Sequence, residues 1–315
     1  MKKGGGTAMS ARNQSHTPFS LLMAVYAGDT PSFVARALKS DTIEQTLLPN
    51  QVVIVRDGPL RRELAQLIDQ YPAQLKAQLL HANRAEEMPE FTIVRLPTNK
   101  GLAHALNFGL KACKYELVAR ADSDDISRPS RFSVLIPLLA SSGLDALGSA
   151  IQEFSNDEHT PGRIRYLPSG GSELRTYATL HSPLHHPSVA FRKTSVCRVG
   201  GYPEGSGRFE DYRLWETMLV AGEHIGNIKK PLVLYRSDTA MYHRRGGMRM
   251  FRDELRLQKD FLHDGFIKPI QYVRNILIRA CYRLLPDQVR SCLYAIMTTL
   301  LNRFHGKSVN DSRKK

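Results

Sequence analysis

The sequence lacks the long apolar segments and the paired cysteines that mark several classes of protein. A helix needs about 20 consecutive apolar residues to cross a bilayer, and no run of even about 18 occurs here, so a membrane-spanning helix is not expected. The cysteines (Cys113, Cys197, Cys281 and Cys292) form no C-x-x-C pair, which argues against a zinc site or a disulfide scaffold and fits a reducing cytosol. Residues 1–18 are basic but lack the apolar core of a secretory signal, so we expect a disordered tail there.

Three functional signatures are also missing. No G-x-G-x-x-G follows the first apolar run, which disfavours a dehydrogenase. Residues 26–31 lack the glycine-rich sequence with Arg and Lys that a nucleotidyltransferase would need. The basic residues show no RNA-recognition or helix-turn-helix pattern, so nucleic acid is not expected as a partner, although the formal net charge is +14. A basic nucleic-acid-binding protein remains the alternative from a different class.

The positive charge is concentrated at the C-terminal end. Residues 244–315 contain 16 Lys or Arg and 6 Asp or Glu, which gives a balance of +10 out of the total of +14. A basic segment of this kind indicates an anionic partner, such as a lipid surface or a polyanion.

Helical spacing of apolar residues accompanies this charge. It predicts helices over residues 248–266, 270–285 and 289–304. We therefore expect a basic amphipathic helical extension over residues 241–305, followed by a disordered tail over residues 306–315. The extension fits two compatible interpretations: packing on the preceding domain, or lying on an anionic membrane.

The first part of the chain alternates apolar runs with helical segments. This pattern predicts β-α-β-α-β-α-β and hence an α/β fold with a mostly parallel sheet. Strands are predicted at residues 20–25, 51–55, 91–96 and 117–119, and helices at residues 31–45 and 60–80, with a third helix capped by Asn99 and running to residue 112.

An acidic cluster follows the fourth predicted strand. Asp122, Ser123, Asp124 and Asp125 bring three carboxylates together, and their mutual repulsion is relieved if they hold a divalent cation on a substrate diphosphate. Asp29 and Asp57 end the first two strands, so all these groups should lie at one edge of a parallel sheet, where ligands bind. The competing interpretation is a solvated acidic turn, in which Asp125 or Ser127 caps a helix opened by Pro129.

The later part of the chain adds further candidates. Residues 144–154 predict a strand, and residues 156–171 predict a mobile polar loop near the site. His181, His185 and His186 lie close in sequence, but no cysteine joins them and the last two would point to opposite faces of an extended chain, so a zinc site is disfavoured.

A helix is predicted to begin near residue 209, with two acids in its first turn. Leu214 and Met218 would face the core, and Trp215 would either line an acceptor pocket or pack inside. The simpler interpretation of the two acids is an ordinary capped amphipathic helix.

The combination of segments resembles the family 2 glycosyltransferases, which have the GT-A nucleotide-diphospho-sugar transferase fold. The resemblance spans about residues 20–236, and its segments are SLLMAVYAGD, VIVRDGP, NKGLAHALNFGL, RADSDD, ISRPSRF, HPSVAF and FEDYRLW. It implies a GT-A catalytic domain over residues 19–240. It also implies metal-dependent, inverting transfer of a hexosyl or N-acetylhexosaminyl group from a nucleotide-sugar, expected to be a UDP-sugar. A non-catalytic partner protein on the same scaffold is an alternative.

The resemblance also assigns roles to residues. Asp211, with Glu210 beside it, would be the general base that accepts the acceptor hydroxyl's proton. Asp124 and Asp122 would hold the divalent cation, Mn²⁺ or Mg²⁺. The acceptor would contact His186 and Trp215. Donor-binding roles fall on Tyr26, Asp29, Asp57, Asn99, Lys100, Gly101, Asp122, Ser123, Arg244 and Arg245.

One segment departs from the general family pattern. Many members have a histidine two residues after a Tyr-Arg pair, which completes the metal shell, but Ser237-Asp238 follows here, so that ligand is in question and His243 is an open substitute. Arg244-Arg245 before two glycines resembles a subgroup that acts in bacterial capsule, exopolysaccharide and lipopolysaccharide O-unit synthesis. This implies a glycan or lipid-linked acceptor and a cytoplasmic, peripheral enzyme at the inner face of the cytoplasmic membrane.

Overall fold

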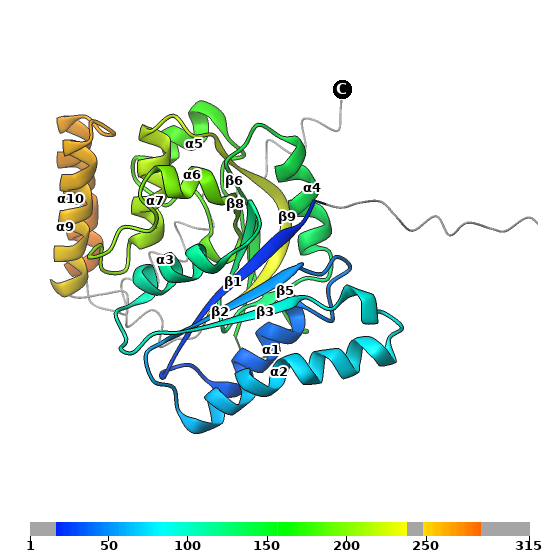
Figure 1. Ribbon diagram of the computed structural model, residues 1–315. Coiled ribbons are helices and arrows are strands. Elements are labelled where there is room, and N and C mark those ends of the chain that lie inside the picture. Colours follow the sequence, from blue (N-terminus) through cyan, green and yellow to red (C-terminus); the bar gives the residue numbers. More distant parts are fainter. Residues whose placement is uncertain (1–16, 156, 238–247, 285–315) are drawn as a thin grey trace, which may run out of the picture.

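The computed structural model describes residues 17–155, 157–237 and 248–284, which form one curved sheet covered by helices on both faces (Figure 1). The first half contains β1 (Phe19–Tyr26), α1 (Pro31–Asp41), β2 (Gln51–Asp57), α2 (Arg62–His81), η1 (Ala85–Glu87), β3 (Glu90–Arg95), α3 (Leu102–Ala112) and β4 (Leu117–Ala121). The second half contains β5 (Ile126–Ser127), α4 (Arg131–Ser141), β6 (Ala146–Phe154), β7 (Ile164–Arg165), α5 (Gly171–Ala178), η2 (His186–Ser188), β8 (Ala190–Arg192), α6 (Lys193–Arg198), α7 (Glu210–Val220), β9 (Ile225–Arg236), α9 (Met248–His263) and α10 (Pro269–Leu284).

The sheet has the order β3-β2-β1-β4-β8-β6-β9-β5, with β7 paired to β6. Strands β1 to β4 are mutually parallel, as the alternating pattern predicted, while β8 is antiparallel to both β4 and β6. The first four strands therefore end at one edge. In the β1–β2 pairing, Tyr26 lies opposite Asp57, and in the β1–β4 pairing Met23 lies opposite Ala121, directly before the acidic cluster.

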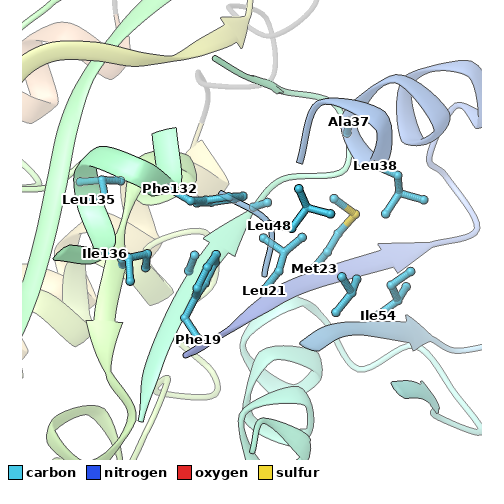
Figure 2. Close-up of a cluster of buried hydrophobic side chains, with 14 of the residues drawn as sticks. Phe19, Leu21, Met23, Ala37, Leu38, Leu48, Ile54, Phe132, Leu135 and Ile136 are labelled. Atoms are coloured by element: carbon cyan, nitrogen blue, oxygen red, sulfur yellow. The ribbon is translucent and has the colours of Figure 1, made fainter. Parts of the chain in front are cut away.

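Both faces of the central strands are buried, which explains their continuous apolar runs. Leu21 and Met23 pack with α1, α2 and α4, and Figure 2 shows them between Leu38 of α1 and Phe132 of α4. Leu22 points to the other face and joins the core formed with α3 and α7. The sheet thus lies between two apolar layers, and the polar residues that follow its parallel strands lie at one edge of the sheet.

Helices α9 and α10 pack against α5 and α7 (Figure 1). The rings of Tyr212 on α7 and Phe261 on α9 meet edge to face, with centroids 4.9 Å apart. The Asn275 side-chain amide of α10 donates 2.7 Å to the carbonyl of Thr179. The packing interpretation of the C-terminal extension is therefore confirmed for these two helices. No helix in the described ranges is long and apolar enough to cross a membrane.

Some predicted boundaries were wrong. Gly101, not Asn99, is the N-cap residue of α3, and no side-chain cap is present there. Its φ of 95° turns the chain so that the backbone amides of Lys100 and Gly101 point at Asp57.

The helix expected to open at Pro129 begins two residues later, because β5 first pairs with β9 and the carbonyl of Pro129 accepts the Thr46 amide at 2.9 Å. The segment predicted as a loop from residue 156 contains β7 and ends at the first residue of α5. The helix predicted over residues 289–304, most of residues 1–18 and all of residues 306–315 lie outside the described residues.

Candidate active site

A cavity of about 620 Å³ opens beside the ends of the central strands. Its wall includes Asp122 and Asp124 after β4, and Glu210 and Asp211 at the start of α7. His186 also lines it. The structure thus brings together five residues that the sequence assigned to metal binding, catalysis and acceptor binding, although they come from three distant segments.

The three aspartates after β4 lie close enough together to hold a metal ion. One carboxylate oxygen from each of Asp122, Asp124 and Asp125 lies within 4.8 Å of the others. One oxygen of Asp125 accepts the Arg236 backbone amide at 2.8 Å, whereas its buried Oδ2 has no hydrogen-bond partner among the described residues. A set of hard oxygen ligands with a buried, unpaired oxygen suits Mn²⁺ or Mg²⁺.

The electrostatics of these aspartates agree with that assignment. Burial, followed by the charge of Asp122, raises the pKa of Asp124 to about 6. The same two causes raise the pKa of Asp125 well above its ordinary value. Burial and the repulsion between neighbouring carboxylates thus disfavour the ionised forms of this cluster, and a bound divalent cation would relieve both effects.

Arg120 interacts with both the aspartate cluster and the candidate base. Its buried guanidinium forms a two-pronged ion pair with Asp122, and its charge limits the rise in the pKa values of Glu210 and Asp211. Burial is the largest influence on the pKa of Arg120 and lowers it, but the charge and hydrogen bonds of Asp122, together with the charges of Tyr202 and Asp125, outweigh burial and leave that pKa raised. Arg131 donates to the carbonyl of Arg120 at 2.5 Å, which holds this part of the backbone in place.

Glu210 and Asp211 occupy the first turn of α7, as predicted. The positive end of a helix favours carboxylates there, but burial dominates. Burial and then the charge of Asp211 raise the pKa of Glu210 to about 7, and burial raises the pKa of Asp211 to about 6. A carboxylate with a pKa near the working pH is suited to general-base catalysis.

The predicted donor-binding residues that the structure describes lie at the same sheet edge. Both oxygens of Asp57 accept backbone amides, from Lys100 at 2.9 Å and Gly101 at 3.0 Å. Asp29 accepts the Tyr26 amide at 2.9 Å. Burial raises the pKa of Asp29 to about 6, against a lowering by the Tyr26 amide.

Ser123 joins these predicted donor-binding residues, because its side chain forms a hydrogen bond with Asp29. The side chains of Asn99 and Lys100 are exposed. Arg244, Arg245 and the open metal ligand His243 lie outside the described residues.

The two predicted acceptor contacts differ. His186 lines the cavity, and its Nε2 lies 3.1 Å from the Tyr202 hydroxyl. Trp215 is fully buried in the core formed with α3 and α7, and it is not part of the cavity wall. The centroids of the Trp215 and His186 rings lie 6.2 Å apart. A ring with no exposed surface cannot touch an acceptor, so the structure favours the packing interpretation of Trp215 and places it behind His186.

Trp215→Phe separates the two interpretations. We expect this variant to lower the free energy of unfolding by roughly 1–3 kcal/mol, because a smaller ring replaces a fully buried indole. The acceptor KM should stay unchanged. Chemical denaturation and steady-state kinetics measure the two effects. An unchanged stability with a raised acceptor KM would restore Trp215 as an acceptor contact.

The structure also adds residues that sequence reasoning missed. Arg236 lies between the rings of Phe33 and Phe154, at 3.8 Å and 4.5 Å, and donates to the Asp124 carbonyl at 2.9 Å. Three more arginines line the cavity from β7, from the segment before α7 and from α10: Arg165, Arg208 and Arg279. The only signal for Arg279 in the sequence is that it interrupts an apolar series.

Comparison with known proteins identifies the family. The sequence profile described as Glycosyl transferase family 2 matches residues 20–200, more than half of the chain. The chain belongs to glycosyl transferase family 2. The resemblance inferred from the sequence is therefore confirmed, and with it the class of enzyme, a glycosyltransferase.

Two curated relatives of this family 2 glycosyltransferase match along most of its length. The UDP-Gal:alpha-D-GlcNAc-diphosphoundecaprenol beta-1,3-galactosyltransferase of Escherichia coli is 37% identical over 277 residues, which cover 88% of this chain and 94% of the relative. The amylovoran biosynthesis glycosyltransferase AmsE of Erwinia amylovora is 32% identical over 280 residues, which cover 88% of this chain and 97% of the relative.

Solved structures confirm the GT-A fold. The mannosyltransferase PcManGT of Pyrobaculum calidifontis, in complex with GDP-Man and Mn²⁺, has a TM-score of 0.60 at 17% identity and covers 94% of this chain and 81% of its own. S. aureus TarS in complex with UDP-GlcNAc has a TM-score of 0.60 at 15% identity and covers 82% of this chain and 70% of its own.

Proposed function

We propose that this glycosyltransferase is metal-dependent and inverting, and that it moves a hexosyl or N-acetylhexosaminyl group from a UDP-sugar to a lipid-linked sugar diphosphate in bacterial surface-glycan synthesis. The observation that carries the proposal is that Asp122 and Asp124 of the aspartate cluster line the same cavity as Glu210 and Asp211. One cavity therefore offers both a place for a metal–diphosphate and a carboxylate base.

The residues would divide the work as follows. Asp124 and Asp122 would hold the cation, which when bound supplies charge stabilisation for the departing diphosphate. Asp211 would accept the proton of the acceptor hydroxyl as that oxygen attacks the anomeric carbon. Arg120 would keep Asp122 in position and, through its charge, keep Asp211 more acidic than burial alone would allow.

The choice of substrates rests on the relatives. The name of the Escherichia coli relative specifies UDP-Gal and a GlcNAc-diphosphoundecaprenol acceptor, and TarS was solved with UDP-GlcNAc. The GT-A fold alone does not choose the base, since PcManGT was solved with GDP-Man. We infer the UDP donor from the relative that covers nearly the whole chain.

A transfer assay tests this proposal. Purified full-length protein would be incubated with Mn²⁺, each of UDP-Gal, UDP-Glc, UDP-GalNAc and UDP-GlcNAc, and a short-chain lipid diphosphate carrying GlcNAc. We expect one donor to give a disaccharide product of the opposite anomeric configuration to the donor, and no product in excess EDTA. Retention of configuration, or full activity in EDTA, would contradict the mechanism.

Helix α10 carries a surface suited to a membrane. Ile270 and Leu277 are 73% and 61% exposed, and Val273 between them is also exposed. Their spacing places them on one face of the helix. Together with the basic charge of residues 244–315, this face fits an anionic bilayer, which is where a lipid-linked acceptor resides.

Val273→Glu combined with Leu277→Glu tests the membrane contact. We expect the fraction that floats with anionic liposomes at moderate salt to fall about tenfold, because two apolar anchors are replaced by charges. Leu80→Glu on α2 is the matched control, since Leu80 is 67% exposed on a different helix. Equal flotation of the double variant and the wild type would remove α10 from the membrane interface.

A further inference from the structure

The cavity wall carries charges of both signs. Its carboxylates are those of Asp122, Asp124, Glu210 and Asp211, and Arg120 and Arg236 of the wall contact the aspartate cluster. Three further arginines, which we call the arginine group, also line the cavity: Arg165, Arg208 and Arg279. A donor diphosphate on the aspartate cluster would not by itself use these three cations.

The arginine group comes from separate elements, and contacts within the protein hold two of its members. Arg279 of α10 donates to the carbonyl of Leu180, and its Nε lies 2.9 Å from the buried carboxylate of Glu254 on α9. Arg165 of β7 lies 3.6 Å from Glu153. Arg208 directly precedes the residues that open α7. The guanidinium groups of Arg165 and Arg279 are thereby prepared to bind an anion with little loss of side-chain freedom.

The histidines beside these arginines remain uncharged. Burial lowers the pKa of His181 to about 4, and the nearby charge of Arg279 contributes to the lowering. Burial also lowers the pKa of His185 well below its ordinary value, with a contribution from Arg165. Both histidines line the cavity, where neutral rings can donate or accept hydrogen bonds beside the arginines.

We propose that Arg165, Arg208 and Arg279 bind the diphosphate of the lipid-linked acceptor, which makes α10 part of the active site. This inference rests on the proposed function, in which donor and acceptor each carry a diphosphate. Two such groups repel each other, so they need separate counter-charges: the metal for the donor and the arginine forks for the acceptor. A neutral glycan acceptor would need no such cluster.

The two faces of α10 fit this arrangement. Nine residues, about two and a half helical turns, separate Ile270 from Arg279, so they lie on opposite faces. Ile270 is 73% exposed, whereas the Arg279 side chain is only 16% exposed and lines the cavity. One helix therefore presents a lipid-compatible face to the outside and a phosphate-binding side chain to the inside, as an acceptor with a diphosphate and a lipid tail requires.

The test compares two acceptors that carry the same sugar. One is GlcNAc α-linked through a diphosphate to a short alkyl chain, and the other is the corresponding alkyl glycoside without phosphate. We expect Arg279→Gln to raise the KM for the diphosphate acceptor about 10- to 100-fold, while the KM values for the UDP-sugar and the phosphate-free acceptor stay within about twofold. Arg279→Lys should retain part of the affinity, because it keeps the charge without the fork.

Further variants keep the test decisive. Arg208→Gln and Arg165→Gln should show the same selective rise, and they carry the test if Arg279→Gln does not fold. Arg256→Gln on α9 is the control, because it makes the same charge change at an exposed site outside the cavity wall. Equal KM changes for both acceptors, or no change in the three cavity variants, would overturn the subsite while leaving the proposed function intact. A wild type that transfers to neither acceptor would instead overturn the proposed function, and with it the subsite.

Discussion

Asp211→Asn is expected to lower kcat by about 10²- to 10⁴-fold, which is the usual contribution of a general base. The asparagine amide has the same size as the carboxylate but cannot accept the hydroxyl proton. Because Asp211 lines the cavity at α7, on a different segment from the aspartate cluster, UDP binding should remain within about twofold of the wild type. Single-turnover kinetics and UDP titration measure the two quantities.

The pH profile of the wild type adds an independent check. Burial raises the pKa of Asp211 to about 6, and a base works only when it is deprotonated. We therefore expect kcat/KM to fall as the pH drops through about 6 and to level off above it. The profile should be lost in the residual activity of Asp211→Asn.

Glu173→Gln is the matched control for Asp211→Asn, because Glu173 also lies in the first turn of a helix, α5, but not on the cavity wall. It should retain wild-type kcat. Normal turnover of Asp211→Asn, or an acid limb of the pH profile that survives the substitution, would remove Asp211 from the base role and direct attention to Glu210.

Asp124→Asn is expected to reduce transfer by at least about 10³-fold, because the cation that stabilises the departing diphosphate loses a ligand. Here binding should fail together with catalysis: UDP affinity should no longer increase when Mn²⁺ is added. Isothermal titration with UDP, with and without Mn²⁺, measures the effect. This pattern is the reverse of the one expected for Asp211→Asn, so the two variants separate metal binding from proton transfer.

Asp260→Asn provides the control for the aspartate change, since Asp260 lies on α9 and is half exposed, away from the aspartate cluster. It should bind UDP and Mn²⁺ like the wild type. If Asp124→Asn keeps its Mn²⁺-dependent UDP affinity, the metal does not sit on this cluster.

Much of the fold and of the candidate active site could be predicted because their signals are local. The apolar runs of β1 and β2 are buried on both faces, and the carboxylates after β4 follow one strand directly. The position of Gly101 could not be predicted in this way. Its cap geometry depends on Asp57, which is 44 residues away, and only the fold brings the two together.

The same reason explains why the arginine group of the cavity was missed. Arg279 meets the carbonyl of Leu180 across 99 residues, and Arg165 lies on a two-residue strand that has no pattern of its own. Trp215 is the reverse case, a residue to which the sequence assigned an acceptor contact although its ring is buried. Glu210 and Asp211, at the start of the same helix, line the cavity, but the Trp215 ring is fully buried in the core behind His186.

The most direct test of the central claim is a thermal-shift measurement of the wild type with UDP, GDP, dTDP and CMP, each with and without Mn²⁺. The claim is that the aspartate cluster holds a nucleotide diphosphate through a cation. We expect UDP to raise the Tm by several degrees only when Mn²⁺ is present, and the other nucleotides to have little effect. A UDP shift that is equally large without Mn²⁺, or no shift with any nucleotide, would contradict the account.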